Sequence, residues 1–248
     1  MEKDGMEKDM AATAGRVFAR AFAAVKTLRP DRPIHPVGLH LRGRLEREGG
    51  PFRSGIAWLD TAGNHEAEAR LSRSIGFPPG WPDIIGLAVR LTADSAPVDI
   101  LLASTGMSRA GRYVLRMCRS VGPAALTTMM PYEGTGGPVQ LAARTLRPHG
   151  RLPADPHGFR DALGGGEWVL GLYHGRPGAP WQRCGTLTLL ASAEAADTSM
   201  RFDPMQHPIP GAGTYSWTQA LREPSYAVAR RPPEKESHRP TDQERGGP

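Results

Sequence analysis

Residues 34–47, IHPVGLHLRGRLER, are the stretch that decides the fold. From Val37 to Glu46 apolar and polar residues largely alternate, so in an extended chain the apolar side chains share one face and the charged ones the other. This period of two is typical of a strand in an antiparallel sheet that is covered on one side. We therefore expect a β-strand here, within a mainly β domain.

Seven other short segments have strand character, and several are bounded by Gly, Pro or Asp. They are residues 54–60, 66–73, 85–92, 98–104, 167–174, 183–191 and 199–202. Eight strands are enough to close a small barrel. A chain of 248 residues suits one such domain with a sizeable core.

Two parts of the chain are expected to be helical. Residues 11–27 are Ala-rich with a helical period, which predicts an amphipathic leading helix. Residues 107–166 form an insertion between the fifth and sixth expected strands, in which 109–119 has helical character and the remainder is rich in Gly and Pro. Part of this insertion should pack as helices outside the barrel, because long structureless loops are rare in compact domains. The expected class is α+β.

The ends of the chain differ in composition from the middle. Residues 1–10 form a charged extension, 11–231 the domain, and 232–248 a Pro-rich, charged tail that we expect to be disordered. The first residues do not resemble a signal peptide and no stretch of 18 apolar residues occurs, so we expect a cytoplasmic protein without a membrane span.

Charge and cysteine content exclude several classes of function. The net charge is +6, but it comes from scattered Arg without a run of five like charges, so nucleic acid is not an expected partner. Cys118 and Cys184 lack the spacing of a zinc site. Two buried free thiols are therefore expected.

Arg222 and Tyr226 are a candidate ligand pair for iron near the C-terminal end. Four residues apart, they would share one face of a helix. A phenol has a pKa of about 10, but Fe(III) and a neighbouring guanidinium both favour the phenolate. Tyr is one of the axial ligands that haem proteins use. By itself the spacing is common, and a surface helix with a packed Tyr is the alternative.

A set of motifs elsewhere resembles the haem catalases. Residues 32–38 (RPIHPVG), with Gly43 five positions on, are similar to the distal-histidine segment of that family, Arg-x-x-His-x-x-Gly. Four further segments resemble family motifs in the family's order, and the Arg222 to Tyr226 pair follows them. They are residues 69–72 (ARLS), 86–90 (GLAVR), 99–102 (DILL) and 201–205 (RFDPM). The resemblance extends over residues 12–230, with the least support in 107–166.

The resemblance implies an eight-stranded antiparallel barrel of catalase type that binds ferric haem. Tyr226 would ligate the iron, and Arg222 would stabilise the tyrosinate. Arg32 and Arg70 match arginines that hold the haem propionates, for which a guanidinium fork is well suited. Each of these arginines could instead belong to a solvated face.

On the distal side the resemblance makes His35 the acid/base. A neutral imidazole can take a proton from a bound peroxide and return it to the departing oxygen. Ser72 would hydrogen-bond and orient this imidazole. The plain alternatives are a turn histidine before Pro36 and a strand serine facing solvent.

The chain also departs from the family. Ser104 lies where catalases carry a distal asparagine, and the chain is about half the usual length, without the segment that ties subunits together. These departures favour a short, divergent catalase-like protein that acts on hydrogen peroxide or organic hydroperoxides, peroxidase-like with weak catalase activity. Catalases are usually tetramers, so a homo-oligomer is kept as an alternative to a monomer.

Two other functions remain to be weighed. One is a catalase-fold barrel that has lost haem chemistry and binds an apolar ligand in the barrel mouth or serves a structural role. The other is a hydrolase, for which the sequence contains neither G-x-S-x-G nor a clustered metal site. An oxidoreductase is the reading that accounts for most of the motifs.

Overall fold

The computed structural model describes residues 36–93, 96–191, 197–216 and 218. The expected leading helix at 11–27, the N-terminal extension and the C-terminal tail lie outside the described residues, and the domain limits at 11 and 231 stay predictions. Arg32, His35, Arg222 and Tyr226 also lie outside them. No helix in the described ranges is long and apolar enough to cross a membrane.

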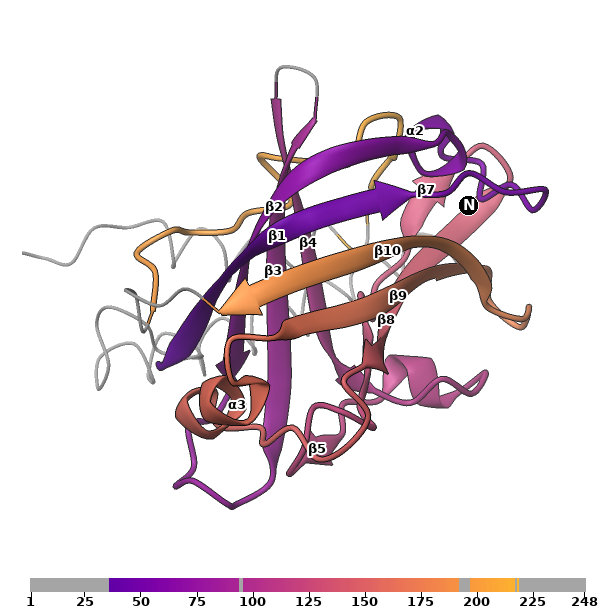
Figure 1. The fold of residues 1–248 in the computed structure, drawn as a ribbon. Coiled ribbons are helices and arrows are strands. Elements are labelled where there is room, and N and C mark those ends of the chain that lie inside the picture. The colour runs from indigo at the N-terminus through magenta and orange to yellow at the C-terminus, as the bar shows by residue number, and fades with distance from the viewer. Residues whose placement is uncertain (1–35, 94–95, 192–196, 217, 219–248) are drawn as a thin grey trace, which may run out of the picture.

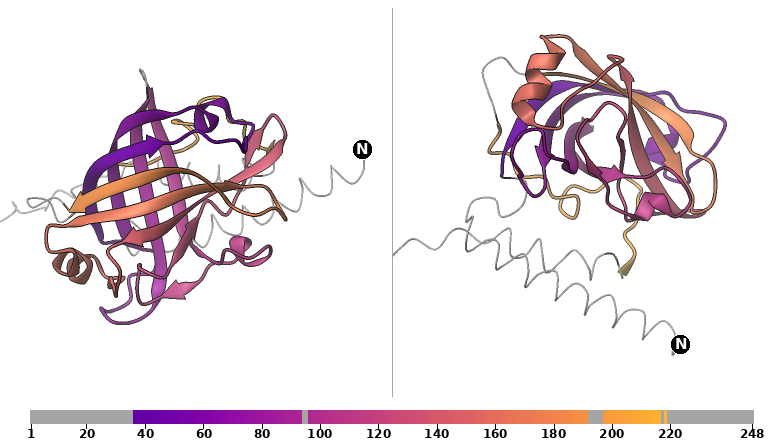
Figure 2. Two further views of the ribbon diagram at one scale, coloured as in Figure 1. Left: turned by 45° about the vertical axis from the view of Figure 1, so that its right-hand side comes forward. Right: turned by 90° about the horizontal axis from the view of Figure 1, so that it is seen from below.

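The described chain forms a closed antiparallel β-barrel of eight strands (Figures 1 and 2). The hydrogen-bonded order is β2-β1-β10-β9-β8-β6-β4-β3, and pairing of β2 with β3 closes the ring. The barrel strands are β1 (Gly38–Arg47), β2 (Gly63–Arg73), β3 (Asp83–Ala93), β4 (Ala96–Thr105), β6 (Ala125–Thr127), β8 (Gly137–Arg147), β9 (Glu167–Gly175) and β10 (Gln182–Ala191). The expected eight-stranded barrel is confirmed.

Short elements surround this ring. Strand β5 (Met117–Cys118) pairs with β3, and β7 (Tyr132–Gly134) pairs with β8. The helical elements are α2 (Ala57–Asp60), the 3-10 turn η1 (Gly111–Tyr113) and α3 (Pro156–Leu163). Helix α3 packs Phe159 edge-on against Trp168 of β9, with ring centroids 5.0 Å apart.

Alternation along the strands separates a core from an outer wall. On β1, Leu39, Leu41 and Leu45 join the apolar core, whereas Arg42 and Arg44 lie between them on the other face and are exposed. The same parity continues around the barrel through the cross-strand pairs. The outer wall can therefore carry polar groups without disturbing the core.

Six of the eight expected strands are confirmed, and two were wrong. Residues 54–60 turn back on themselves and end in α2, because the Asp60 carboxylate accepts hydrogen bonds from the amides of Ser54 and Gly55 and from the Ser54 hydroxyl. Gly55, at φ +89°, allows this turn. Residues 199–202 are irregular and pair with no strand in the described part of the chain.

The insertion at 107–166 supplies two barrel strands, β6 and β8, besides helix α3. The expected helix at 109–119 is wrong, since this stretch contains only η1 and β5. Arg112 is the physical reason. Its buried guanidinium donates to the carbonyls of Arg176 and Ala179 and stacks on Trp181 at 4.3 Å, which fixes the turn against the β9–β10 connection.

Gly43 marks the closest approach of β1 to β10, and its replacement is expected to be costly. A Cβ at this position would lie 1.8 Å from the Thr188 carbonyl oxygen, a backbone atom that cannot move aside alone. We expect Gly43→Ala to lower the free energy of unfolding by about 3 kcal/mol, measured by urea denaturation. Gly50→Ala is the control, because no atom lies within 4 Å of a Cβ there. Equal stability of the two variants would contradict this reading.

Candidate functional site on the outer wall

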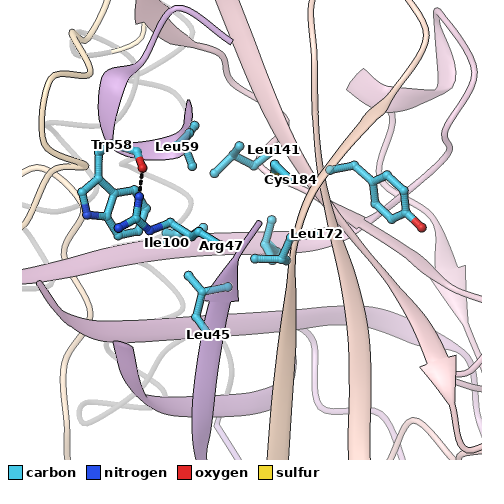
Figure 3. A pocket seen from close by; sticks show the side chains of 10 residues that line it. Leu45, Arg47, Trp58, Leu59, Ile100, Leu141, Leu172 and Cys184 are labelled. Carbon is cyan, nitrogen blue, oxygen red and sulfur yellow. Dashed lines mark hydrogen bonds between the residues drawn. The ribbon is translucent and has the colours of Figure 1, made fainter. Parts of the chain in front are cut away.

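The barrel encloses a small cavity that is lined by residues of β1, α2 and β4, among others. This cavity measures about 20 Å³, which is enough for about one water molecule. Figure 3 shows its lining, in which Leu45, Leu141 and Leu172 point toward one another and Arg47 donates to the carbonyl of Trp58. This cavity is too small for the apolar ligand of the expected alternative, and the candidate site considered next lies on the outer wall.

Small residues from four neighbouring strands form one row across this wall, which we call the small-residue row. In register, Gly38 of β1 pairs with Ser72 of β2, Ser72 with Gly86 of β3, and Gly86 with Ala103 of β4. Cross-strand neighbours of this kind lie about 5 Å apart. Three segments that are distant in sequence, each holding one of the family-like motifs, thus meet in one row of small residues, in which Gly38, Ser72 and Gly86 are buried and the Arg70 guanidinium lies over Gly38.

Ser72 lies in this row and is 5% exposed. Its Oγ is 3.5 Å from the carbonyl oxygen of Gly86, at the outer limit for a hydrogen bond. The neighbouring Gly38 follows His35 by three residues in the sequence. Ser72 is therefore placed opposite the strand that continues from the expected distal-histidine segment.

Arg70 lies two residues before Ser72 on β2, on the same face of the strand, and it binds an acidic partner. Its Nε and Nη2 donate to the two carboxylate oxygens of Asp197, at 2.6 and 2.8 Å, and the amide of Gly38 donates to the same carboxylate at 3.0 Å. This two-pronged pair is the strong form of a guanidinium–carboxylate contact. Arg70 thus binds the start of residues 197–218, which we call the strap.

A second cluster fixes the strap to β3 and β4. The Arg90 guanidinium donates to both oxygens of the fully buried Asp99, at 2.7 and 2.6 Å, and also to the carbonyl of Arg201. Asp99 further accepts from the amide of Asp203 and lies 2.9 Å from Nδ1 of His207. The hydrogen bonds that Arg90 donates to Asp99 raise the pKa of Arg90. Three family-like motifs meet in this cluster.

The strap has a third attachment at β7. The amides and carbonyls of Glu133 and Gly213 exchange two hydrogen bonds, each 2.8 Å long. The strap therefore runs from β1 and β2, past β3 and β4, to β7, and it is drawn in light orange in Figure 1. Its last described residue, Thr218, precedes Arg222 by four positions and Tyr226 by eight.

Ser104 does not share the face of Ser72. It lies opposite Ile85 and Leu126, on the core side of the wall, and is fully buried. Its Oγ accepts from the amide of Ile85 at 3.0 Å and donates to the carbonyl of Arg116 at 2.6 Å. The outer-wall position beside Ser72 and Gly86 is Ala103.

The two cysteines have different surroundings. Cys184 is buried beside the interior cavity, and burial raises the pKa of its thiol to about 12. Cys118 on β5 is partly exposed, so the expectation of two buried thiols was wrong for this residue. Neither position suggests a reactive thiolate at the outer wall.

Comparison with known proteins adds evidence from structure alone. No family model matches the sequence, and no curated protein matches it. Among solved structures, catalase A from Saccharomyces cerevisiae superposes with a TM-score of 0.60 at 13% identity, over 81% of this chain and 60% of that one. The fold is catalase-like. A fungal catalase gives a TM-score of 0.58 at 14% identity, over 80% of this chain and 58% of that one.

The catalase-like fold extends over most of the chain, yet the chain spans only about three fifths of the length of these two catalases. At such low identity the likeness concerns the arrangement of strands. It agrees with the barrel expected from the resemblance, and it leaves the roles of individual residues to be tested.

Sequence reasoning missed the partners that fix the strap. Asp197 and His207 stood outside every motif, and Asp99 was quoted only as part of a strand. Their partners Arg70 and Arg90 lie 127 and 117 positions away from Asp197 and His207, respectively. The buried acidic residue Asp99 in an apolar strand was the one signal available, because a buried carboxylate requires a cationic or hydrogen-bonding partner.

Proposed function

We propose that this protein binds ferric haem against the outer wall of its barrel and acts on hydrogen peroxide or an organic hydroperoxide. The small-residue row carries the proposal. Its four positions bring small side chains of β1–β4 together on a face that is shielded from solvent at Gly38, Ser72 and Gly86, and Ser72 belongs to the row. The strap lies beside it and leads in sequence toward Arg222 and Tyr226.

In this proposal Tyr226 is the iron ligand, and the Arg222 guanidinium holds its phenol in the charged form. Haem would supply the electrons that cleave the O–O bond. Arg32 is the proposed partner of a propionate. Arg70 serves as a positioning residue, since two of its N–H groups are donated to Asp197.

His35 is the proposed acid/base on the distal side. Its imidazole would accept the proton of the bound peroxide and deliver it to the leaving oxygen, a role that suits a pKa near neutrality. The Ser72 hydroxyl would orient the ring. With Ser104 turned to the core, Ala103 offers no hydrogen bond at the outer wall, which favours slow peroxidase-like turnover over rapid dismutation.

Hemin titration of the purified full-length chain tests the proposal. We expect saturable uptake with a Soret band, and slow oxidation of a dye when peroxide is added. Ala103→Phe places an aromatic ring on the small-residue row and should weaken hemin binding by at least about tenfold. Thr92→Phe, an exposed position further along β3, is the matched control.

Two results would overturn the proposal. One is a wild-type protein that takes up no hemin. The other is an Ala103→Phe variant that is folded by circular dichroism and binds hemin as well as Thr92→Phe does.

A further inference from the structure

An exposed apolar patch lies at one end of the barrel, next to the end of the small-residue row, because the β2–β3 turn follows Ser72 and precedes Gly86. It consists of side chains from the β2–β3 turn and from the segment that leads into β5, and we call it the end patch. Its members, with their exposed fractions, are Ile75 (40%), Phe77 (39%), Trp81 (63%), Tyr113 (43%), Val114 (58%), Leu115 (43%) and Met117 (50%). Met117 pairs with Ile84, so the two segments adjoin. Both lie at the bottom of Figure 1.

Buried polar groups hold the β2–β3 turn in place. The Asp83 carboxylate, fully buried, accepts hydrogen bonds from the amides of Ile75, Gly76 and Phe77. The Arg73 guanidinium donates to the carbonyls of Pro78 and Trp81. The exposed aromatic side chains are therefore presented on a fixed, convex turn.

The charge around the end patch is mainly positive, although helix α3 at the same end of the barrel carries the exposed Asp161. Arg109, Arg116 and Arg119 are exposed beside it, whereas residues 74–82 and 106–123 contain no Asp or Glu. A groove of about 530 Å³ adjoins Arg119 and is also lined by His149 and Arg151. Apolar tips and guanidinium groups thus share one end of the molecule.

We propose that the end patch docks the protein on an anionic lipid bilayer. Aromatic side chains with a polar edge, such as Trp81, are suited to the interface between headgroups and acyl chains. Guanidinium groups around them pair with lipid phosphates and carboxylates. A second copy of the chain is a poorer occupant, since two such faces would bring their arginines together. A protein partner would need a pocket to receive the convex turn.

Vesicle sedimentation with the full chain tests this proposal. We expect binding to vesicles of equal parts phosphatidylcholine and phosphatidylserine, little binding to phosphatidylcholine alone, and a blue shift of fluorescence that is lost in Trp81→Phe. The double variant Arg116→Gln/Arg119→Gln should bind about thirtyfold more weakly. The double variant Phe77→Ser/Trp81→Ser should lose most of the vesicle binding that the wild type retains at high salt.

Matched controls lie at the opposite end of the barrel. Arg44→Gln/Arg53→Gln removes the same net charge from exposed positions, and Phe52→Ser removes an aromatic side chain that is 62% exposed. Both should bind like wild type. The proposal is overturned if the wild type ignores anionic vesicles, or if the control and end-patch variants lose binding equally. Hemin uptake does not enter either outcome.

Discussion

Replacing Tyr226 by phenylalanine is expected to abolish the tyrosinate-type spectrum of the hemin-loaded protein. Phenylalanine keeps the ring and removes only the oxygen that would ligate the iron. We expect hemin affinity to fall by at least about a hundredfold, because even groups behind a metal ligand contribute 10- to 100-fold. Absorption and electron paramagnetic resonance spectra of the loaded protein measure the change.

The control for Tyr226→Phe is Tyr113→Phe, which alters a tyrosine that is 43% exposed. It should leave the spectrum as in wild type. Arg222→Leu supplies a second test, since loss of the guanidinium raises the pKa of a phenol ligand. As the pH is lowered, iron ligation should therefore be lost at a higher pH in Arg222→Leu than in the wild type. A wild-type spectrum in Tyr226→Phe would remove this residue from the iron.

Removing the Asp99 carboxylate is expected to release the middle of the strap from β3 and β4, while its attachments at Arg70 and Glu133 remain. Asp99 is fully buried and accepts from Arg90, from the amide of Asp203 and from the His207 side chain. Asp99→Ala leaves these donors without their acceptor, which should lower the free energy of unfolding by about 3 kcal/mol. Urea denaturation measures this loss, and limited proteolysis should cut faster within 197–218.

The exposed pair of Asp161 with Arg160 provides the matched comparison. The Asp161 side chain is 70% exposed, so Asp161→Ala should change stability by well under about 1 kcal/mol. If Asp99→Ala is as stable and as protease-resistant as Asp161→Ala, the strap is held by other contacts.

The barrel was predictable because its strands keep apolar and polar residues on opposite faces. Strand β1 is the clearest case, and β3 and β4 follow it. The two segments that were wrongly expected to be strands, residues 54–60 and 199–202, have no such alternation over a comparable length. At 54–60 the backbone is held by Asp60, and at 199–202 it is held by Arg90 and Asp99. Contacts of this kind depend on the tertiary structure, which local periodicity does not record.

The insertion was misjudged for a related reason. Strand β6 has only three residues, too few to show a period, and β8 begins after a Gly-rich turn. Their partners β4 and β9 complete the ring. The strand count of eight was therefore reached with two wrong members, while two true barrel strands lay inside the segment expected to cover the barrel.

For the candidate site, the resemblance placed Ser72 beside the distal-histidine segment, and the register pairs Ser72 with Gly38, the last residue of that segment. Ser104 was placed by its position in a motif, whereas the side to which it points follows from strand parity. The proposed roles of His35 and Tyr226 remain predictions. The contact of Asp197 with Arg70 could not be predicted from the sequence, because the two residues lie 127 positions apart.

Each strand has a core face and an outer face, so the residues that determine the stability of the barrel differ from the residues that form the candidate site. Substitutions in the small-residue row leave Leu39, Leu71 and Leu87 untouched, since these neighbours in sequence point the other way. A lineage could thus exchange the side chains on the outer wall while the packed interior keeps the same thermal tolerance. The core face of the strands maintains the fold, and the side chains of the outer face can change without altering that core.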